Sequence, residues 1–246
     1  LHSCSDVTDI LLSICPVEIP TIITLHCYIY EDLPLAYGKW LGTLLCWLEK
    51  RMLQSASTVI TCSKTLKTLY ENTIPRKYVA IQNGIETAAW KNDESQASIR
   101  ERLGLLNKGI IFLSTNLLIA RKDPQCLIKA FKLANIPNSQ LLLLGDGDRE
   151  LACKELDAND SRIIFVGRVD NVKDYLYAAD ILVSASHSEG LPYAILEAEV
   201  SGIQLILSDI PQHREVLVDN NQGMFFSVGD FRELSRLMKE STTHIG

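Results

Sequence analysis

The amino-acid sequence predicts an α/β protein with two doubly wound domains, of which the first is incomplete. Short β-branched or wholly apolar runs alternate with helical segments along all 246 residues. Strands that are apolar throughout are typical of parallel sheets whose two faces are covered by helices. A polar stretch at residues 87–108 interrupts the alternation. We therefore expect a partial first domain at 1–86, a linker at 87–108 and a second domain at 109–246.

The first domain shows three strand-like runs with helical material between them. Strands are expected at residues 20–26, 58–62 and 78–82, and helices at 39–53 and 63–72. Ser63 is suited to cap the second of these helices. Because the chain begins with Leu1 close to a strand, we expect the start to lie inside a longer protein.

The second domain continues the alternation over a longer stretch. Strands are expected at 109–114, 140–144, 162–166, 181–184 and 204–207, and helices at 123–134, 148–156, 172–178, 193–201 and 230–240. A short helical piece is also expected to end at Leu103. This order predicts a Rossmann-like sheet whose ligand lies at the carboxyl ends of the strands.

Composition excludes several classes of protein. The net charge is −6 and no basic run occurs, so nucleic acid is not expected as the main partner. The seven cysteines show no zinc-ligand spacing and fit reduced thiols, so neither a disulfide nor a structural zinc is expected. The longest apolar stretch, residues 41–48, is far too short to span a bilayer. We expect a cytoplasmic protein, with peripheral contact to the membrane as an open alternative.

The segment at residues 186–202 carries the strongest chemical pattern. Glu189 and Glu197 flank a turn containing Gly190 and Pro192, at the start of a helix. Free backbone N–H groups and the helix dipole at such a point suit a phosphate. Glu197, about one turn into the helix, is placed to accept two vicinal hydroxyls. Two solvated glutamates on a surface helix are the alternative reading.

The two glutamates are separated by seven residues within E-G-L-P-x-x-x-L-E-A, and this resembles the E-x7-E motif of glycosyltransferase family four, which has the GT-B fold. The resemblance implies that Glu189 approaches the donor sugar, as a catalytic residue, and that Glu197 binds the nucleotide ribose. It also implies that the intervening segment with Gly190, Leu191 and Pro192 holds the diphosphate, through the backbone N–H groups that the turn leaves free.

Residues 116–123 resemble the family's diphosphate-neutralising loop. Lys122 matches the family's lysine, whereas Leu117 stands at the position of its arginine. Arg121 is the nearby replacement. The alternative for both cations is a solvated helix start.

Two further turns resemble family segments. Residues 145–150 resemble a Gly-Asp-Gly turn, and Gly167 with Arg168 matches a turn beside the nucleobase. Asp146 and Asp148 could instead be taken for a metal-binding D-x-D motif, but a structural turn is the better interpretation, and no metal is expected.

Weaker matches complete the pattern. His26 sits where many family members have a histidine that reaches a sugar, although a histidine at a strand end is as often structural. Residues 208–215 resemble a family turn, and we expect them to form one wall of the ligand cleft. Residues 83–85 resemble the family's sequence just before the hinge between its two domains. Glu199 and Gln204 depart from the family pattern and hint at a divergent copy.

The resemblance implies a retaining, metal-independent glycosyltransferase without a cofactor. The donor would be a nucleoside diphosphate sugar, and the acceptor a glycan, a lipid-linked or a small-molecule hydroxyl. An epimerase or phosphorylase-like enzyme of the same fold, or a catalytically inactive sugar-nucleotide-binding protein, remain as alternatives. We expect the chain as given to bind donor without completing transfer, and to be less soluble than a longer form because of exposed sheet edges.

Overall fold

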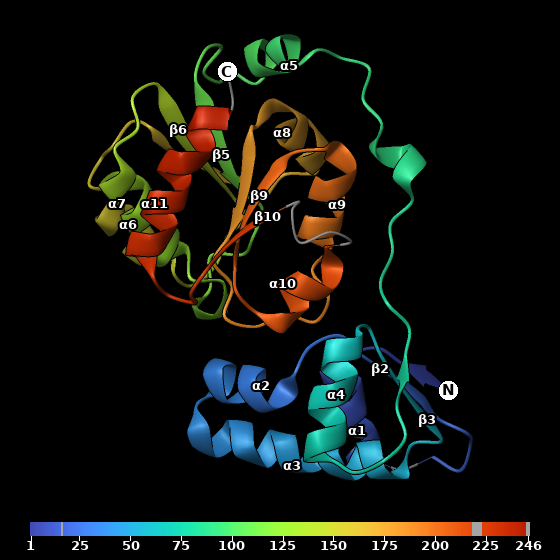
Figure 1. Cartoon of the computed structure of the whole chain (residues 1–246). Coiled ribbons are helices and arrows are strands. Elements are labelled where there is room, and N and C mark those ends of the chain that lie inside the picture. The colour runs from blue at the N-terminus through green and yellow to red at the C-terminus, as the bar shows by residue number, and fades with distance from the viewer. Residues whose placement is uncertain (16, 218–222, 245–246) are drawn as a thin grey trace. The chain divides into compact units, whose positions relative to one another are not determined.

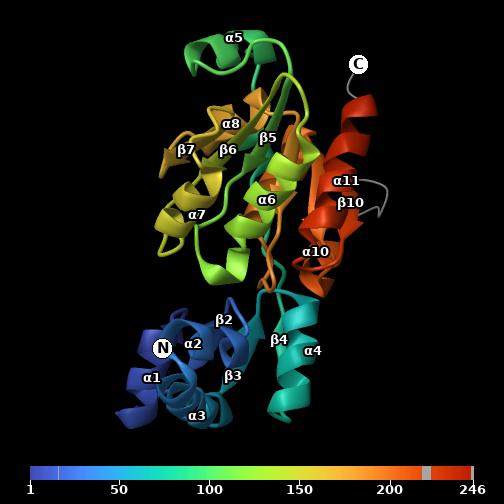
Figure 2. The ribbon, with the colours of Figure 1, turned by 90° about the vertical axis from the view of Figure 1, so that its left-hand side faces the viewer.

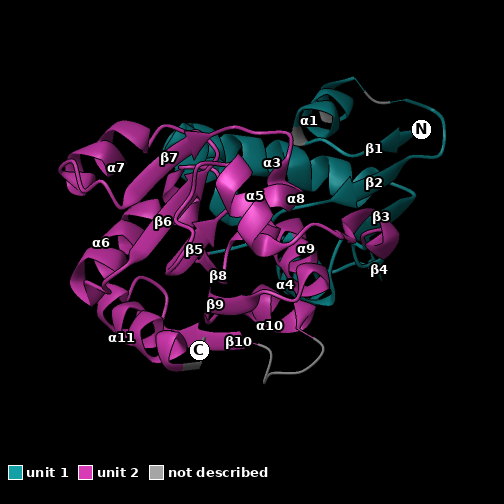
Figure 3. Cartoon of the chain, turned by 90° about the horizontal axis from the view of Figure 1, so that it is seen from above, with its two compact units in different colours: residues 1–84, 188–192 teal, residues 85–187, 193–246 magenta. Residues whose placement is uncertain are grey.

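The structure is a computed structural model that describes residues 1–15, 17–217 and 223–244. It divides into two compact units (Figure 3), unit 1 with residues 1–84 and 188–192, and unit 2 with residues 85–187 and 193–246. Each unit has its own parallel sheet with helices packed against it (Figure 1). The predicted α/β class is therefore confirmed.

Unit 2 is built on a six-stranded parallel sheet in the order β10-β9-β8-β5-β6-β7. The strands are β5 (Ile110–Ser114), β6 (Ser139–Leu144), β7 (Ile163–Gly167), β8 (Ile181–Ser184), β9 (Gln204–Ser208) and β10 (Gly223–Phe226). The helices are α5 (Gln96–Arg102), α6 (Pro124–Ala134), α7 (Glu150–Asp157), α8 (Val172–Ala178), α9 (Tyr193–Ser201), α10 (Pro211–Val216) and α11 (Phe231–Ser241). In Figure 2, α6, α7 and α11 lie together on one side of this sheet.

The strands of unit 2 form its core. Every residue from Ile111 to Ser114 is buried, as is the run from Leu141 to Leu144. Phe112 meets Phe131 of α6 edge-on, with ring centroids 6.0 Å apart. Apolar strands without alternation are thus explained by burial on both faces, as the sequence predicted.

Unit 1 has four parallel strands in consecutive order, β1-β2-β3-β4. They are β1 (His2–Ser3), β2 (Ile22–Leu25), β3 (Thr58–Thr61) and β4 (Val79–Ala80), connected by α1 (Asp6–Ile14), α2 (Ile29–Tyr37), α3 (Lys39–Ser55) and α4 (Lys64–Thr73). Ser63 caps α4 by accepting a hydrogen bond from the Leu66 N–H at 3.0 Å, as expected from the sequence.

The unit 1 sheet has one buried and one exposed face among the described residues. Ile23 and Val59, which pair in the register, are both 0% exposed. On the opposite face Ile22 is 38%, Val79 41% and Ile81 58% exposed. Parallel sheets normally have both faces covered, so we expect this apolar face to favour association between molecules.

The segment at 85–108 belongs to unit 2, although the sequence placed 87–108 in a linker and ended the first domain at residue 86. It contains a 3-10 turn, η1 (Thr87–Trp90), and α5. Arg100 of α5 forms a 2.7 Å ion pair with Asp180, and the Tyr177 hydroxyl donates to the Trp90 carbonyl at 2.6 Å. The Arg100 side chain and the Trp90 backbone are therefore engaged with the rest of unit 2.

Helices α1 and α2 were not expected from the sequence. Pro34 lies inside α2, where proline removes a backbone hydrogen bond. A Cβ added at Gly42 of α3 would lie 2.5 Å from the Pro34 Cα, so the two helices approach closely at this point. Packing between α2 and α3 thus outweighs the low helix propensity of the segment.

Candidate functional site

Strand order in unit 2 reverses between β5 and β8. From β5 the chain proceeds through β6 to β7, and it returns to place β8 on the other side of β5. In sheets of this kind ligands bind outside the carboxyl ends of the strands at the reversal. The loop after β5 and the amino end of α9, which follows β8, therefore define the candidate site in unit 2.

The loop after β5 carries Arg121 and Lys122, in a 3-10 turn designated η2 (Ala120–Lys122). Its backbone is tied to the end of β8, because the N–H of His187 donates to the Arg121 carbonyl at 2.8 Å. The His187 Nε2 also lies 3.1 Å from Oδ2 of Asp123. These two bonds fix the cation-bearing loop beside the residues that precede Ser188.

Asp123 holds the junction between this loop and α6. It has left-handed backbone geometry, with φ 44° and ψ 55°, which aspartate tolerates better than most residues. Its Oδ1 accepts from the Cys126 N–H at 3.1 Å and caps α6, while Oδ2 faces His187. The Asp123 carboxylate thus caps α6 and also links the loop after β5 to the segment after β8.

Side chains at the ends of β5, β8 and β9 form a hydrogen-bonded group. The Asn116 amide donates to the Ser184 hydroxyl at 3.2 Å, and Ser184 and Ser186 hydroxyls are also 3.2 Å apart. The Ser208 hydroxyl donates to the Ser186 carbonyl at 2.6 Å, and Nδ1 of buried His213 donates to the Ser208 carbonyl at 2.8 Å. The segment predicted as a cleft wall is therefore anchored to the end of β8.

The glycine after β6 allows a neighbouring loop to approach, and the glycine that ends β7 has a left-handed backbone. Gly145 has φ 109°, and an added Cβ would lie 2.7 Å from the Asn116 carbonyl oxygen. Its N–H donates to the Gly167 carbonyl at 2.7 Å, and Gly167 has φ 78°. Asp146 and Asp148 are exposed, and no group of three potential metal-binding side chains occurs in the described part of the chain.

Glu197 is half-buried in α9, and burial raises the pKa of its carboxyl above the ordinary glutamate value. Arg168, which was also predicted to bind the donor, is exposed. The structure thus places Arg121, Lys122, Gly167, Arg168 and Glu197 all in unit 2.

The remaining five predicted residues, which are His26, Glu189, Gly190, Leu191 and Pro192, belong to unit 1. A Cβ added at Gly190 would overlap the His26 carbonyl oxygen and lie 3.0 Å from Sγ of Cys62. The Asn83 amide donates to the Leu191 carbonyl at 3.2 Å. Segment 188–192 therefore lies against the ends of β2, β3 and β4, and the structure brings Gly190 and His26 together.

Sequence reasoning missed His187 and the role of Asp123. Their signal was present, because His187 follows a strand and directly precedes the Ser188-Glu189 pair. Residues 83–85 resemble the family segment before the hinge, and in the structure the Asn83 amide donates to the Leu191 carbonyl.

Comparisons with known proteins identify the group to which the chain is similar. Residues 95–242 match the family described as glycosyl transferases group 1. An Escherichia coli UDP-Gal:alpha-D-GlcNAc-diphosphoundecaprenol alpha-1,3-galactosyltransferase is 27% identical over 247 residues, covering 94% of this chain and 62% of the relative. The putative teichuronic acid biosynthesis glycosyltransferase TuaC of Bacillus subtilis is 29% identical over 197 residues, or 78% of this chain and 48% of the relative. The chain thus spans less than two thirds of either relative.

Solved structures show the same fold. The Anabaena HepE structure in complex with UDP-glucose has a TM-score of 0.86 at 17% identity, covering 99% of this chain and 69% of that one. WaaG, a glycosyltransferase involved in lipopolysaccharide biosynthesis, has a TM-score of 0.77 at 16% identity, covering 95% and 71%. These likenesses confirm the expected GT-B fold. Since the family match covers more than half of the sequence, the chain belongs to the glycosyl transferases group 1 family.

Proposed function

We propose that the protein transfers a sugar from a nucleoside diphosphate sugar to a hydroxyl acceptor with retention of anomeric configuration. Unit 2 would bind the donor. One observation carries the proposal: the loop bearing Lys122 and the amino end of α9 follow neighbouring strands, β5 and β8, at the reversal of strand order. This pairing supplies cations and a helix dipole at one sheet edge.

The chemistry required is stabilisation of a departing diphosphate. Lys122, with Arg121 beside it, and the amino end of α9 would carry the developing negative charge. Attack from the same face, with a phosphate oxygen taking the acceptor proton, needs no protein nucleophile. Glu197 would accept the ribose hydroxyls, and Glu189 would orient the sugar.

The names of similar proteins suggest which nucleotide and which acceptor class to test first. The HepE structures contain UDP, and the E. coli relative is named for a UDP-galactose donor and a lipid-diphosphate acceptor. We therefore propose UDP as the first nucleotide to test and a lipid-linked sugar as the acceptor class.

Isothermal titration with UDP, GDP and ADP tests the site. We expect one diphosphate to bind, and Lys122→Ala to weaken that binding roughly ten- to a hundredfold, because a charged hydrogen bond is lost. Lys129→Ala is the matched control, since Lys129 is exposed on α6 and loses the same charge. Failure of the folded protein to bind any of the three would overturn the assignment.

A catalytically silent sugar-nucleotide-binding protein is the second candidate. Leu117, which is 49% exposed, stands where the family has an arginine, so one of two phosphate-neutralising cations is missing. Binding of a donor sugar without transfer, with acceptor present and in a form of full family length, would favour this candidate. Conversion of the donor sugar to an isomer would instead indicate an epimerase.

A further inference from the structure

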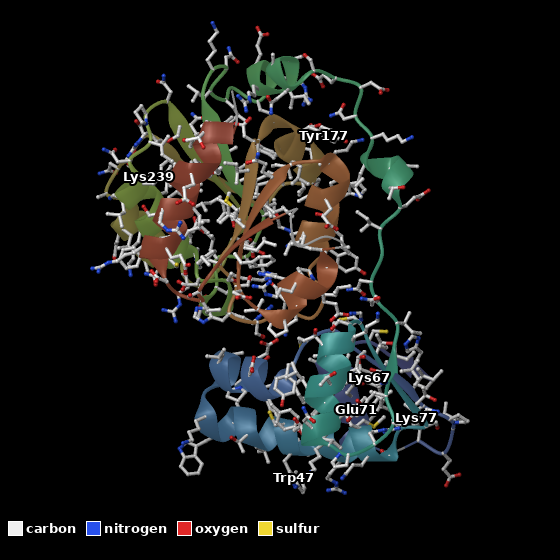
Figure 4. All side chains as sticks on the ribbon, viewed as in Figure 1. Trp47, Lys67, Glu71, Lys77, Tyr177 and Lys239 are labelled. Carbon is white, nitrogen blue, oxygen red and sulfur yellow. The ribbon has the colours of Figure 1, made fainter. Side chains whose placement is uncertain are left out.

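The outer face of α3 exposes large apolar side chains in a helical stripe. Trp40, Leu44 and Trp47 are spaced four and three residues apart, so they share one face of the helix. They are 92%, 52% and 52% exposed. Figure 4 shows Trp47 projecting away from the ribbon. The inner face of α3 packs within unit 1 through buried residues such as Cys46 and Leu53.

The charges on this helix are arranged with one sign outward. Lys39, Lys50 and Arg51 are exposed, whereas Glu49, the only acidic residue in the α3 sequence, is buried. The Arg51 guanidinium lies over the Trp47 ring, 5.1 Å from its centroid. We call Lys39, Trp40, Leu44, Trp47, Lys50 and Arg51 the α3 face.

The neighbouring helix α2 extends the apolar part of the surface. Leu35 and Tyr37, in its last turn, are 64% and 55% exposed, and they come just before the start of α3. The apolar stripe is thus continued by uncharged residues at this end of α2. The acidic residues Glu31 and Asp32 lie in its first turn, which begins beside Cys46 of α3.

A small apolar pocket adjoins this face. Its volume is about 260 Å³, and it is lined by Tyr30, Pro34, Thr43, Cys46, Trp47 and Lys50. The Tyr30 hydroxyl is buried and has no hydrogen-bond partner among the described residues. The pocket offers an apolar space beside an exposed tryptophan and a lysine.

We propose that the α3 face binds the surface of an anionic lipid bilayer. Tryptophan and leucine beside lysine and arginine form the surface of helices that lie in the membrane interface, with rings among the headgroups and cations toward anionic lipid. No helix in the described ranges is long and apolar enough to cross a membrane. This binding does not depend on the proposed donor site.

Vesicle flotation of the full chain tests the proposal. Binding is expected to vesicles of phosphatidylcholine with phosphatidylglycerol, and to be much weaker to phosphatidylcholine alone. Trp40→Ser with Leu44→Ser should reduce the affinity roughly tenfold or more, because apolar area no longer enters the interface. Lys50→Gln should reduce it roughly fivefold, an effect that salt should mask.

A control with equally exposed apolar residues separates this surface from general stickiness. Leu151 and Leu133 of unit 2 are 78% and 50% exposed, so Leu151→Ser with Leu133→Ser removes comparable area elsewhere and should leave flotation unchanged. Thermal unfolding should be unaltered in every variant. Absence of vesicle binding, equal loss in the control, or a wild-type dimer that becomes monomeric in the Trp40→Ser, Leu44→Ser variant would overturn the proposal.

Discussion

Replacement of Arg100 by leucine should strongly destabilise unit 2. The guanidinium forms a 2.7 Å ion pair with Asp180, and the side chains are only 5% and 10% exposed. It also donates to the carbonyls of Ala178 at 2.7 Å and Gly109 at 3.2 Å. Removing one partner of a buried pair leaves an uncompensated charge, which costs about 3–5 kcal/mol. This is a large fraction of the stability of a typical domain.

Urea unfolding followed by far-UV circular dichroism measures the effect. The matched control is Arg102→Leu in the same helix, because Arg102 pairs with Glu94 at 2.8 Å and Asp174 at 2.9 Å but is 45% exposed. Exposed ion pairs contribute little, so this variant should unfold close to the wild type.

A double variant shows whether the stranded charge is the cause. Asp180 also accepts from the Ile111 N–H at 2.8 Å, and asparagine can keep that bond without a charge. Arg100→Leu with Asp180→Asn should therefore be more stable than Arg100→Leu alone. The reasoning is refuted if Arg100→Leu unfolds like Arg102→Leu, or if the second substitution recovers nothing.

Three further predictions concern other parts of the chain. Gly190→Ala should lower the free energy of unfolding of unit 1 in urea by about 1–3 kcal/mol, because the new Cβ overlaps a backbone carbonyl at the end of β2. Gly84→Ala is the control and should change this free energy little, because an added Cβ there has no atom within 4 Å. Equal effects of the two substitutions would contradict the close contact at Gly190. Glu197→Gln should raise the melting temperature near neutral pH, because burial raises the carboxyl pKa and penalises the charged form. That gain should vanish as acid protonates Glu197, and a gain that grows in acid would be the wrong sign. Ile22→Thr with Ile81→Thr should raise the monomer content on size exclusion, and an unchanged elution profile would show that the exposed sheet face is harmless.

Hydrophobic pattern was sufficient to predict most of unit 2. Its strands are apolar in continuous runs, and helix signals such as Asp123 before Pro124 stand at the observed boundaries. In unit 1 the pattern was insufficient for α2, because Pro34 argues against a helix and only packing on α3 at Gly42 compensates. The polar composition of residues 87–108 predicts a linker. Arg100 and Arg102 of this segment form ion pairs with Asp180 and Asp174, which composition alone does not reveal.

The candidate site was predictable as a set of strand ends, because parallel strands bring their carboxyl ends to one edge whatever the loops do. The bonds within it were not predictable, since the contact of His187 with Asp123 depends on a left-handed backbone at Asp123. Gly190 illustrates the same limit. The sequence assigned it to phosphate binding, whereas its small size is already required by the close backbone contact in unit 1. A loss of activity in Gly190→Ala would therefore not distinguish ligand binding from folding. Lys122→Ala gives the sharper test of the donor site, because it shortens a side chain and introduces no new atom.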